Sequence, residues 1–168
     1  MTTPEAPGPR LRAPAHRVSP RARAWWTLRS VIGTLVVLLP QVVAAVVVPR
    51  IADVLLVTGA ATLVVGVVHG LVVPRVRYAL HRWEMTDDAV HTLSGWLSLE
   101  WRIAPISRVQ TVDTDRGPLQ RLFGLSSVTV TTASASGALA IDGLDADAAV
   151  ALADRLTRVT ETLGGDAT

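Results

Sequence analysis

The chain has 168 residues, 49% of them hydrophobic, and a formal net charge of +2. It contains no cysteine, which excludes a disulfide framework, a thiolate metal site and a cysteine nucleophile. Its 16 basic residues are all arginine, a bias that, with abundant alanine and valine, is typical of a GC-rich bacterial genome. The apolar residues are concentrated between positions 31 and 73. Outside this apolar region and the first 30 residues, about 95 residues remain, enough for one small domain.

The first segment, residues 1–24, is rich in proline, alanine and arginine and lacks a core-forming pattern. We therefore expect a disordered cytoplasmic tail. Two roles for its arginines stay open: each could bind anionic lipid with about 1 kcal/mol, or they could serve only to orient the membrane spans. Because no aromatic residues are interleaved with these arginines, we expect no nucleic-acid binding.

Two apolar stretches follow, and within residues 25–74 they predict a hairpin of two transmembrane helices. Residues 31–48 form 18 positions without a charge, and residues 54–73 form 20 positions in which His69 is the ionisable group. A helix of about 20 apolar residues crosses a bilayer. Two helices buried in a soluble core are the disfavoured alternative, because so small a domain can hardly enclose them. Since the link of residues 49–53 is short, the helices must be antiparallel neighbours.

The arginines predict the orientation of this hairpin. Six precede the first span, three closely follow the second, and the link carries Arg50 alone. Because cytoplasmic flanks are enriched in arginine, we expect both termini in the cytoplasm of a bacterium and the link outside its plasma membrane. Trp25 and Trp26, a few residues before the first span, lie at the depth expected of an interfacial aromatic belt.

Polar and small residues inside the spans predict how the two helices pack. We expect Gln41, which follows Pro40, to hydrogen-bond to the other helix, and a transport site is the less favoured interpretation. Gly59, Gly66 and Gly70 permit close helix contact. One histidine without an acidic partner inside the spans is too little for an ion pathway.

From residue 75 the hydrophobic period changes to two, which predicts strands. The predicted strands are residues 78–85, 89–93, 97–104, 108–114, 127–133 and 138–141, with a short helix over residues 118–124. The alternation is clearest over residues 97–104. Its apolar members are Leu97, Leu99, Trp101 and Ile103. We expect these side chains to face the core and their polar neighbours Glu100 and Arg102 to face solvent.

A C-terminal helix completes the domain. Asp145 is a suitable N-cap, and an apolar stripe with helical spacing follows it. The stripe consists of Leu152, Leu156, Val159 and Leu163. We expect this helix to cover the sheet. The predicted fold class is therefore α+β, with a two-helix transmembrane hairpin followed, over residues 75–164, by an antiparallel β-sheet domain capped by a C-terminal α-helix.

Several motifs of this domain occur in a characteristic order. They occupy residues 82–88, Gly95 and residues 106–113, 116–125, 131–134 and 142–144. Over residues 75–163 this order and spacing resemble the bacterial pleckstrin-homology (PH) domain of the YdbS-like (DUF304) membrane proteins, and the preceding hairpin resembles that family's layout. The resemblance implies a PH-like fold and no enzymatic activity. It also implies assembly with a second copy or with a sister membrane protein that carries several PH domains.

The matched motifs contain a candidate interaction surface for a protein or a lipid headgroup. Its residues are Arg108, Gln110, Asp113, Arg116, Gly117, Pro118, Leu119, Arg121, Phe123 and Gly124. A structural role is the favoured alternative: the glycines, the proline and the apolar residues would shape a tight strand-to-helix corner. In that interpretation Arg108 or Arg121 pairs with Asp113. At Asp142 the chain departs from the family, which often has proline there.

No catalytic or metal-binding pattern stands out in the sequence. The histidines at positions 16, 69, 81 and 91 lack metal-ligand spacing, and the adjacent Asp87 and Asp88 predict a turn. We expect no cofactor and no bound metal. The favoured function is a non-enzymatic, membrane-anchored PH-like interaction module, with envelope stress or antimicrobial-peptide resistance as the hypothetical process. The alternative is a sensor of anionic lipid surfaces, and a small transporter or enzyme is the least favoured hypothesis.

Overall fold

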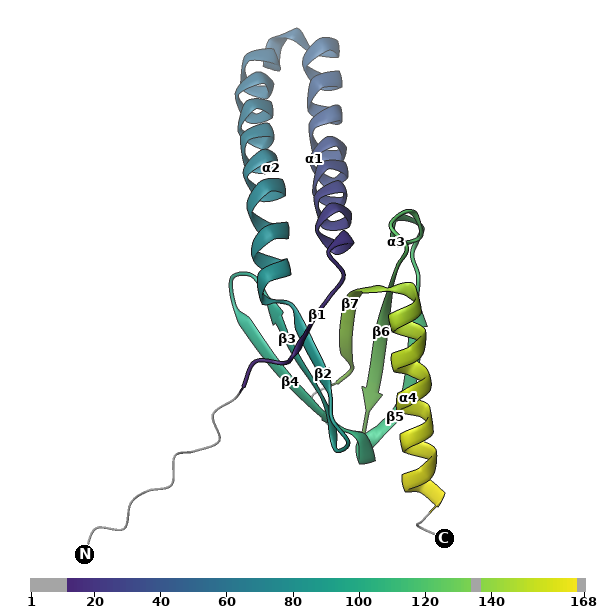
Figure 1. The fold of residues 1–168 in the computed structure, drawn as a ribbon. Helices are drawn as coiled ribbons and strands as arrows, with labels where there is room; N and C mark the ends of the chain where they lie inside the picture. Colours follow the sequence, from purple (N-terminus) through teal and green to yellow (C-terminus); the bar gives the residue numbers. More distant parts are fainter. Residues whose placement is uncertain (1–11, 134–136, 166–168) are drawn as a thin grey trace, which may run out of the picture.

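The computed structural model describes residues 12–133 and 137–165, and Figure 1 shows a long helix pair extending from a β-rich domain. Helices α1 (Arg21–Val47) and α2 (Ala52–Leu80) are joined by the 3₁₀ turn η1 (Pro49–Ile51). Both are long and apolar enough to cross a membrane. Of their most hydrophobic stretches, only 0% and 6% are buried. The alternative of two helices buried in a soluble core is therefore wrong.

Small and polar residues hold the helix pair together. A Cβ atom built at Gly66 would overlap the side chain of Thr34, so the two helices pack too closely at this position for a residue larger than glycine. Gln41 Nε2 donates a hydrogen bond to Thr62 Oγ1 of the other helix at 3.1 Å. This bond confirms the role predicted for Gln41.

The first sheet contains strands β1 (His16–Arg17), β2 (Arg82–Met85), β3 (Ala89–Gly95) and β4 (Leu99–Pro105), antiparallel and in that order. The strand predicted over residues 78–85 is wrong in its first part, because α2 continues to Leu80. The helical ladder persists there, with His81 N donating to Arg77 O at 2.7 Å, and Tyr78 packs against the core from the helix.

The second sheet contains β5 (Val109–Asp115), β6 (Leu125–Thr132) and β7 (Leu139–Asp145), also antiparallel and in that order. The 3₁₀ turn η2 (Ile106–Arg108) leads into β5, and the short helix α3 (Pro118–Leu122) joins β5 to β6. Helix α4 (Ala146–Gly165) follows β7 and buries Leu152 and Leu156 in the core. The antiparallel β domain with a C-terminal helix is thus confirmed.

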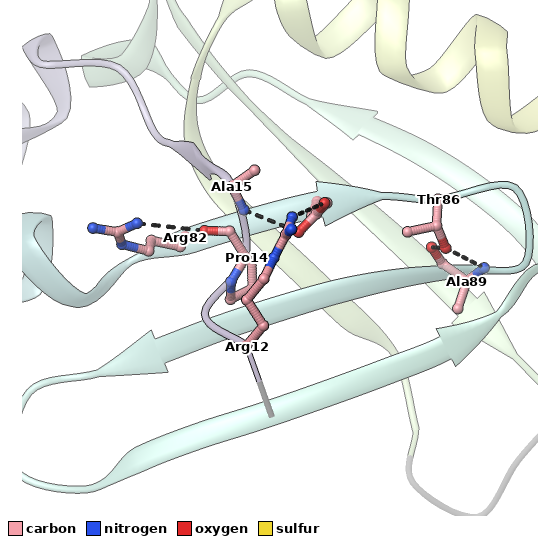
Figure 2. A network of polar contacts seen from close by, with 7 residues as sticks. Arg12, Pro14, Ala15, Arg82, Thr86 and Ala89 are labelled. Carbon is pink, nitrogen blue, oxygen red and sulfur yellow. Dashed lines mark hydrogen bonds and ion pairs between the residues drawn. The ribbon is translucent and has the colours of Figure 1, made fainter. Parts of the chain in front are cut away.

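The predicted boundary of the N-terminal tail differs from the structure. Residues 1–11 of the proposed tail lie outside the described residues, but the chain from residue 12 onward belongs to the domain. His16 and Arg17 pair with β2, and Val18 and Ala22 are buried. Arg12 Nη2 lies 2.8 Å from Glu84 Oε1 in the polar network of Figure 2.

The backbone of the N-terminal segment is tied to β2 as well. Ala15 N donates to Glu84 Oε2 at 3.0 Å, and Arg82 Nη1 donates to Pro14 O at 3.5 Å (Figure 2). These bonds join residues almost seventy positions apart, so the composition of residues 12–24 alone could not reveal them. The prediction of disorder over this part is wrong because tertiary partners satisfy its backbone.

The two tryptophans at the start of α1 lie in the core of the domain rather than at the lipid interface. Trp25 is 7% exposed and Trp26 4%. Both approach Gly143, which has a φ of +78°, and a Cβ atom there would lie only 2.8 Å from the Cβ of Ala22. Glycine is required on β7 because α1 packs directly on the strand backbone. The predicted role of these tryptophans as interfacial anchors is therefore wrong.

Candidate functional site

The predicted interaction motif lies along β5, in α3 and in the turns beside them. Arg108, Gln110, Asp113, Arg116 and Arg121 are exposed, whereas Leu119 and Phe123 pack against the core. No ion pair joins Asp113 to Arg108 or Arg121 among the described residues, and the pairing predicted from the sequence is wrong. The Asp113 carboxylate instead accepts a hydrogen bond from Thr111 Oγ1 at 3.4 Å.

A buried glutamine that sequence reasoning missed organises the corner at α3. Gly117 N donates to Gln120 Oε1 at 2.8 Å, and Gln120 Nε2 donates to Ser127 Oγ at 2.8 Å. Gly124 ends the turn with a φ of +66°, where glycine is favoured. Pro118 begins the helix, and a glutamine two residues later can bond back to the backbone at its start, a capping pattern readable from sequence. This geometry supports the structural role of the motif, and a role in binding a partner stays a prediction.

Strand β4 follows the predicted alternation only in part: Glu100 is exposed as expected and Trp101 is half-buried, but other apolar residues of this stretch face outward. Leu97, Leu99 and Ile103 are 83%, 56% and 51% exposed. Ala104, on the same side of the strand as Arg102, is buried, and Arg102 Nη1 donates to Ala138 O, just before β7, at 2.6 Å. The prediction that the apolar residues face the core is therefore wrong.

The pairing register explains this reversal. Ala104 pairs with Val90 and Arg102 with Thr92, and residues directly opposite each other in an antiparallel pair share a face. Because Val90 and Ala104 both belong to the buried core cluster, the side of β4 that carries Ala104 and Arg102 points inward. We call the exposed side of the strand, formed by Leu99, Trp101 and Ile103, the β4 outer face. Since β4 is the last strand of its sheet, this apolar face lies on an edge.

A second cluster joins the helix pair to the domain. Arg77 Nη2 lies 3.2 Å from Asp142 Oδ2 on β7, and the Arg77 guanidinium lies 4.6 Å from the centroid of the Trp26 ring. The Trp26 ring also meets His81 edge-on, with centroids 5.9 Å apart. Residues of both long helices and of β7 thus meet at one junction, which the sequence did not reveal because these residues are far apart in the chain.

The junction holds a histidine that is neutral near pH 7. Burial lowers the pKa of His81 from 6.5 to about 4, with the charge of Arg77 acting in the same direction and that of Asp142 in the opposite one. Within the described residues, His81 Nδ1 makes no hydrogen bond. The arrangement contains no nucleophile beside a base, so its chemistry is that of a packed, polar joint between the helix pair and the domain.

The turn between β3 and β4 reaches the helix pair itself. The Trp96 ring meets His69 of α2 edge-on, with centroids 6.1 Å apart. His69 precedes Arg75 by six residues, which places it about 9 Å farther along the helix toward the apolar stretch. Figure 1 shows this turn beside the domain-proximal end of α2. An aromatic side chain of the domain therefore lies beside α2 within residues 54–73, whereas Trp25 and Trp26 precede the apolar stretch of α1.

Metal chemistry has no support in the described part of the chain, where no group of three or more histidine, aspartate or glutamate side chains could hold an ion. The carboxylate of Asp87, in the turn after β2, is 98% exposed and lies 3.7 Å from Arg155 of α4.

Comparison with known proteins places these features in a family context. A model of the bacterial PH domain matches residues 34–160. The chain is 31% identical over 155 residues to the UPF0699 transmembrane protein YdbS of Bacillus subtilis (strain 168), an alignment that covers 88% of this chain and 96% of that protein. No solved structure matches this chain.

Proposed function

Because this chain belongs to the bacterial PH domain family and carries two helices long and apolar enough to cross a membrane, we propose that it is a non-enzymatic interaction module held at the cytoplasmic face of the bacterial plasma membrane. Its partner is a second copy or a sister PH-domain membrane protein, which binds the β4 outer face. The similarity to a transmembrane protein over most of both chains supports the membrane part of this proposal.

The observation that carries the proposal is the reversed strand. On an ordinary surface strand the apolar side chains face the core, but here Leu99 and Ile103 are more than half exposed while Ala104 is buried. Exposed apolar groups on an edge strand typically mark a protein interface or an aggregation hazard. The β4 outer face carries no arginine, which favours a protein partner over an anionic lipid surface at this place.

The orientation rests on the arginine asymmetry together with the fold. The domain lies at the end of the helix pair opposite η1, as Figure 1 shows, and the arginine-rich flanks lie at that same end. Because arginine-rich flanks favour the cytoplasm, the domain and both termini belong on that side. A partner anchored in the same membrane can then approach the domain from the side.

Crosslinking through an introduced cysteine tests the proposal, because the chain has no cysteine of its own. The full-length Leu99→Cys variant is treated with a bis-maleimide in membranes from bacteria that carry the natural partner genes. We expect this variant to yield a dimer or a larger adduct. Val150→Cys is the matched control, since Val150 is a 54% exposed apolar residue on α4. Only monomer from Leu99→Cys, or the same adduct from both variants, would refute the β4 interface.

A further inference from the structure

One face of the helix pair contains a groove of about 740 Å³. Its apolar part is lined by side chains of both helices, among them Val37 and Val65, with Gly33 along its wall. Its domain-proximal end is lined by Arg29, Arg77 and other polar or aromatic groups. Pockets that hold small ligands typically measure about 300–1,000 Å³. The groove thus combines an apolar channel at membrane depth with a cationic end near the membrane surface.

The cationic end contains an arginine that the protein does not neutralise. Arg77 pairs with Asp142, but Arg29 is exposed and makes no ion pair within the described residues. Both guanidiniums face the same groove, so the two positive charges share one carboxylate. An anionic group bound there would form charge-assisted hydrogen bonds with Arg29.

The aromatic residue beside this end belongs to the cytoplasmic domain. Trp96 lines the groove together with His69, which it contacts edge-on. Tryptophan favours the headgroup region of a bilayer because its ring is apolar and its N–H is polar. The β3–β4 turn therefore closes the side of the groove at the depth where a lipid headgroup lies.

The opposite face of the helix pair provides an internal comparison. A second groove there is lined by Arg23 and Arg75, at a similar depth. The Arg75 side chain donates a hydrogen bond to Leu71 O, and the Arg23 guanidinium lies 5.6 Å from the centroid of the Tyr78 ring. Because both arginines interact with the protein, only the first groove offers an arginine without such a partner among the described residues.

We propose that the first groove binds one anionic phospholipid from the leaflet next to the domain. The phosphate lies at Arg29, an acyl chain runs past Gly33 and Val65, and Trp96 packs beside the headgroup. The ligand class follows from charge and position, since a lipid is the one molecule that presents an anionic head and an apolar chain at this depth. This proposal does not depend on the partner of the β4 outer face.

Native mass spectrometry of the full chain in mild detergent tests the proposal with phosphatidylglycerol and phosphatidylcholine as probes. We expect one retained phosphatidylglycerol per chain and at least about tenfold weaker retention of phosphatidylcholine, because its choline cation adds a positive charge beside Arg29 and Arg77, which both line the groove. The Arg29→Gln variant should lose this preference. The Gly33→Leu variant should lose lipid retention altogether, because Gly33 has no atom within 4 Å of a built Cβ and a leucine there extends into the groove.

Two matched controls keep the result specific. Arg75→Gln removes an equal charge from the opposite face, and Val36→Leu enlarges an exposed apolar side chain of α1 that does not line the first groove, so both should bind phosphatidylglycerol as the unmodified chain does. Equal retention of the two lipids, or equal loss in Arg75→Gln and Arg29→Gln, would overturn the proposal. If a variant fails to fold, thermal unfolding of the unmodified chain decides: phosphatidylglycerol must raise its Tm more than phosphatidylcholine.

Discussion

Arg77 Nη2 lies 3.2 Å from Asp142 Oδ2, and this ion pair joins the last turns of α2 to strand β7. The two side chains are 32% and 35% exposed, so solvent screens the pair only in part. The pair therefore forms a polar link between the helix pair and the domain.

We expect Asp142→Asn to lower the stability of the domain by about 1 kcal/mol, because Arg77 would remain half-buried without a carboxylate. Thermal unfolding of the full chain in mild detergent measures the change. Glu100→Gln is the control, since it removes a carboxylate from the more exposed pair with Arg102. If both substitutions lower Tm equally, the junction pair has no special role.

His81 predicts a stability that depends on pH. Its pKa is about 4 in the folded chain and 6.5 in the unfolded chain, so between these values the unfolded state binds more protons. The stabilisation is fully present above pH 6.5 and is lost progressively as pH falls toward 4, by on the order of 3 kcal/mol. We expect His81→Gln to flatten this pH dependence of unfolding, and an unchanged pH dependence in this variant would contradict the role of His81.

Gly66 predicts a strict size limit in the helix pair. A Cβ atom at this position would overlap Thr34, a β-branched residue that cannot swing away, so Gly66→Ala must separate the helices. Gly33→Ala adds the same methyl group where no atom lies within 4 Å. We expect a lower Tm in detergent for the Gly66 variant alone. Equal Tm values would show that the helices do not pack as described.

The hydrogen bonds of the buried Gln120 side chain should stabilise the corner at α3. Its amide joins Gly117 N to Ser127 Oγ while only 7% exposed, so Gln120→Ala leaves two buried polar groups without partners. We expect a loss of about 1–3 kcal/mol in the free energy of unfolding. Gln110→Ala, at an exposed position on β5, should change stability by less than about 0.5 kcal/mol. Denaturant unfolding of the full chain compares the two variants.

The proposed orientation predicts which introduced cysteines a membrane-impermeant maleimide can reach in intact cells. Ile51→Cys, in the turn between the helices, should be labelled, whereas Ala133→Cys, after β6 in the domain, should be labelled only after the cells are opened. Labelling of Ala133→Cys in intact cells would reverse the assigned orientation.

The helices and most of the strands of this protein could be predicted from local patterns in its sequence. Two uncharged apolar stretches with a five-residue link imply an antiparallel helix pair, and the hydrogen bond from Gln41 to Thr62 follows from the cost of an unpaired amide in hydrocarbon. The strands after residue 85, the short helix at Pro118 and the C-terminal helix are likewise local patterns. Each depends on periodicity or on turn chemistry that a short window contains.

Which side of each element faces the core was decided only by the tertiary structure. The alternation along β4 predicts an apolar face and a polar face, but the pairing of Ala104 with the core residue Val90 turns Leu99 and Ile103 outward. Trp26 resembles a lipid anchor in the sequence, yet it is buried because β7 presents the glycine that lets α1 approach. Periodicity specifies that an element has two faces, but which face is buried depends on neighbours that lie far away in the chain.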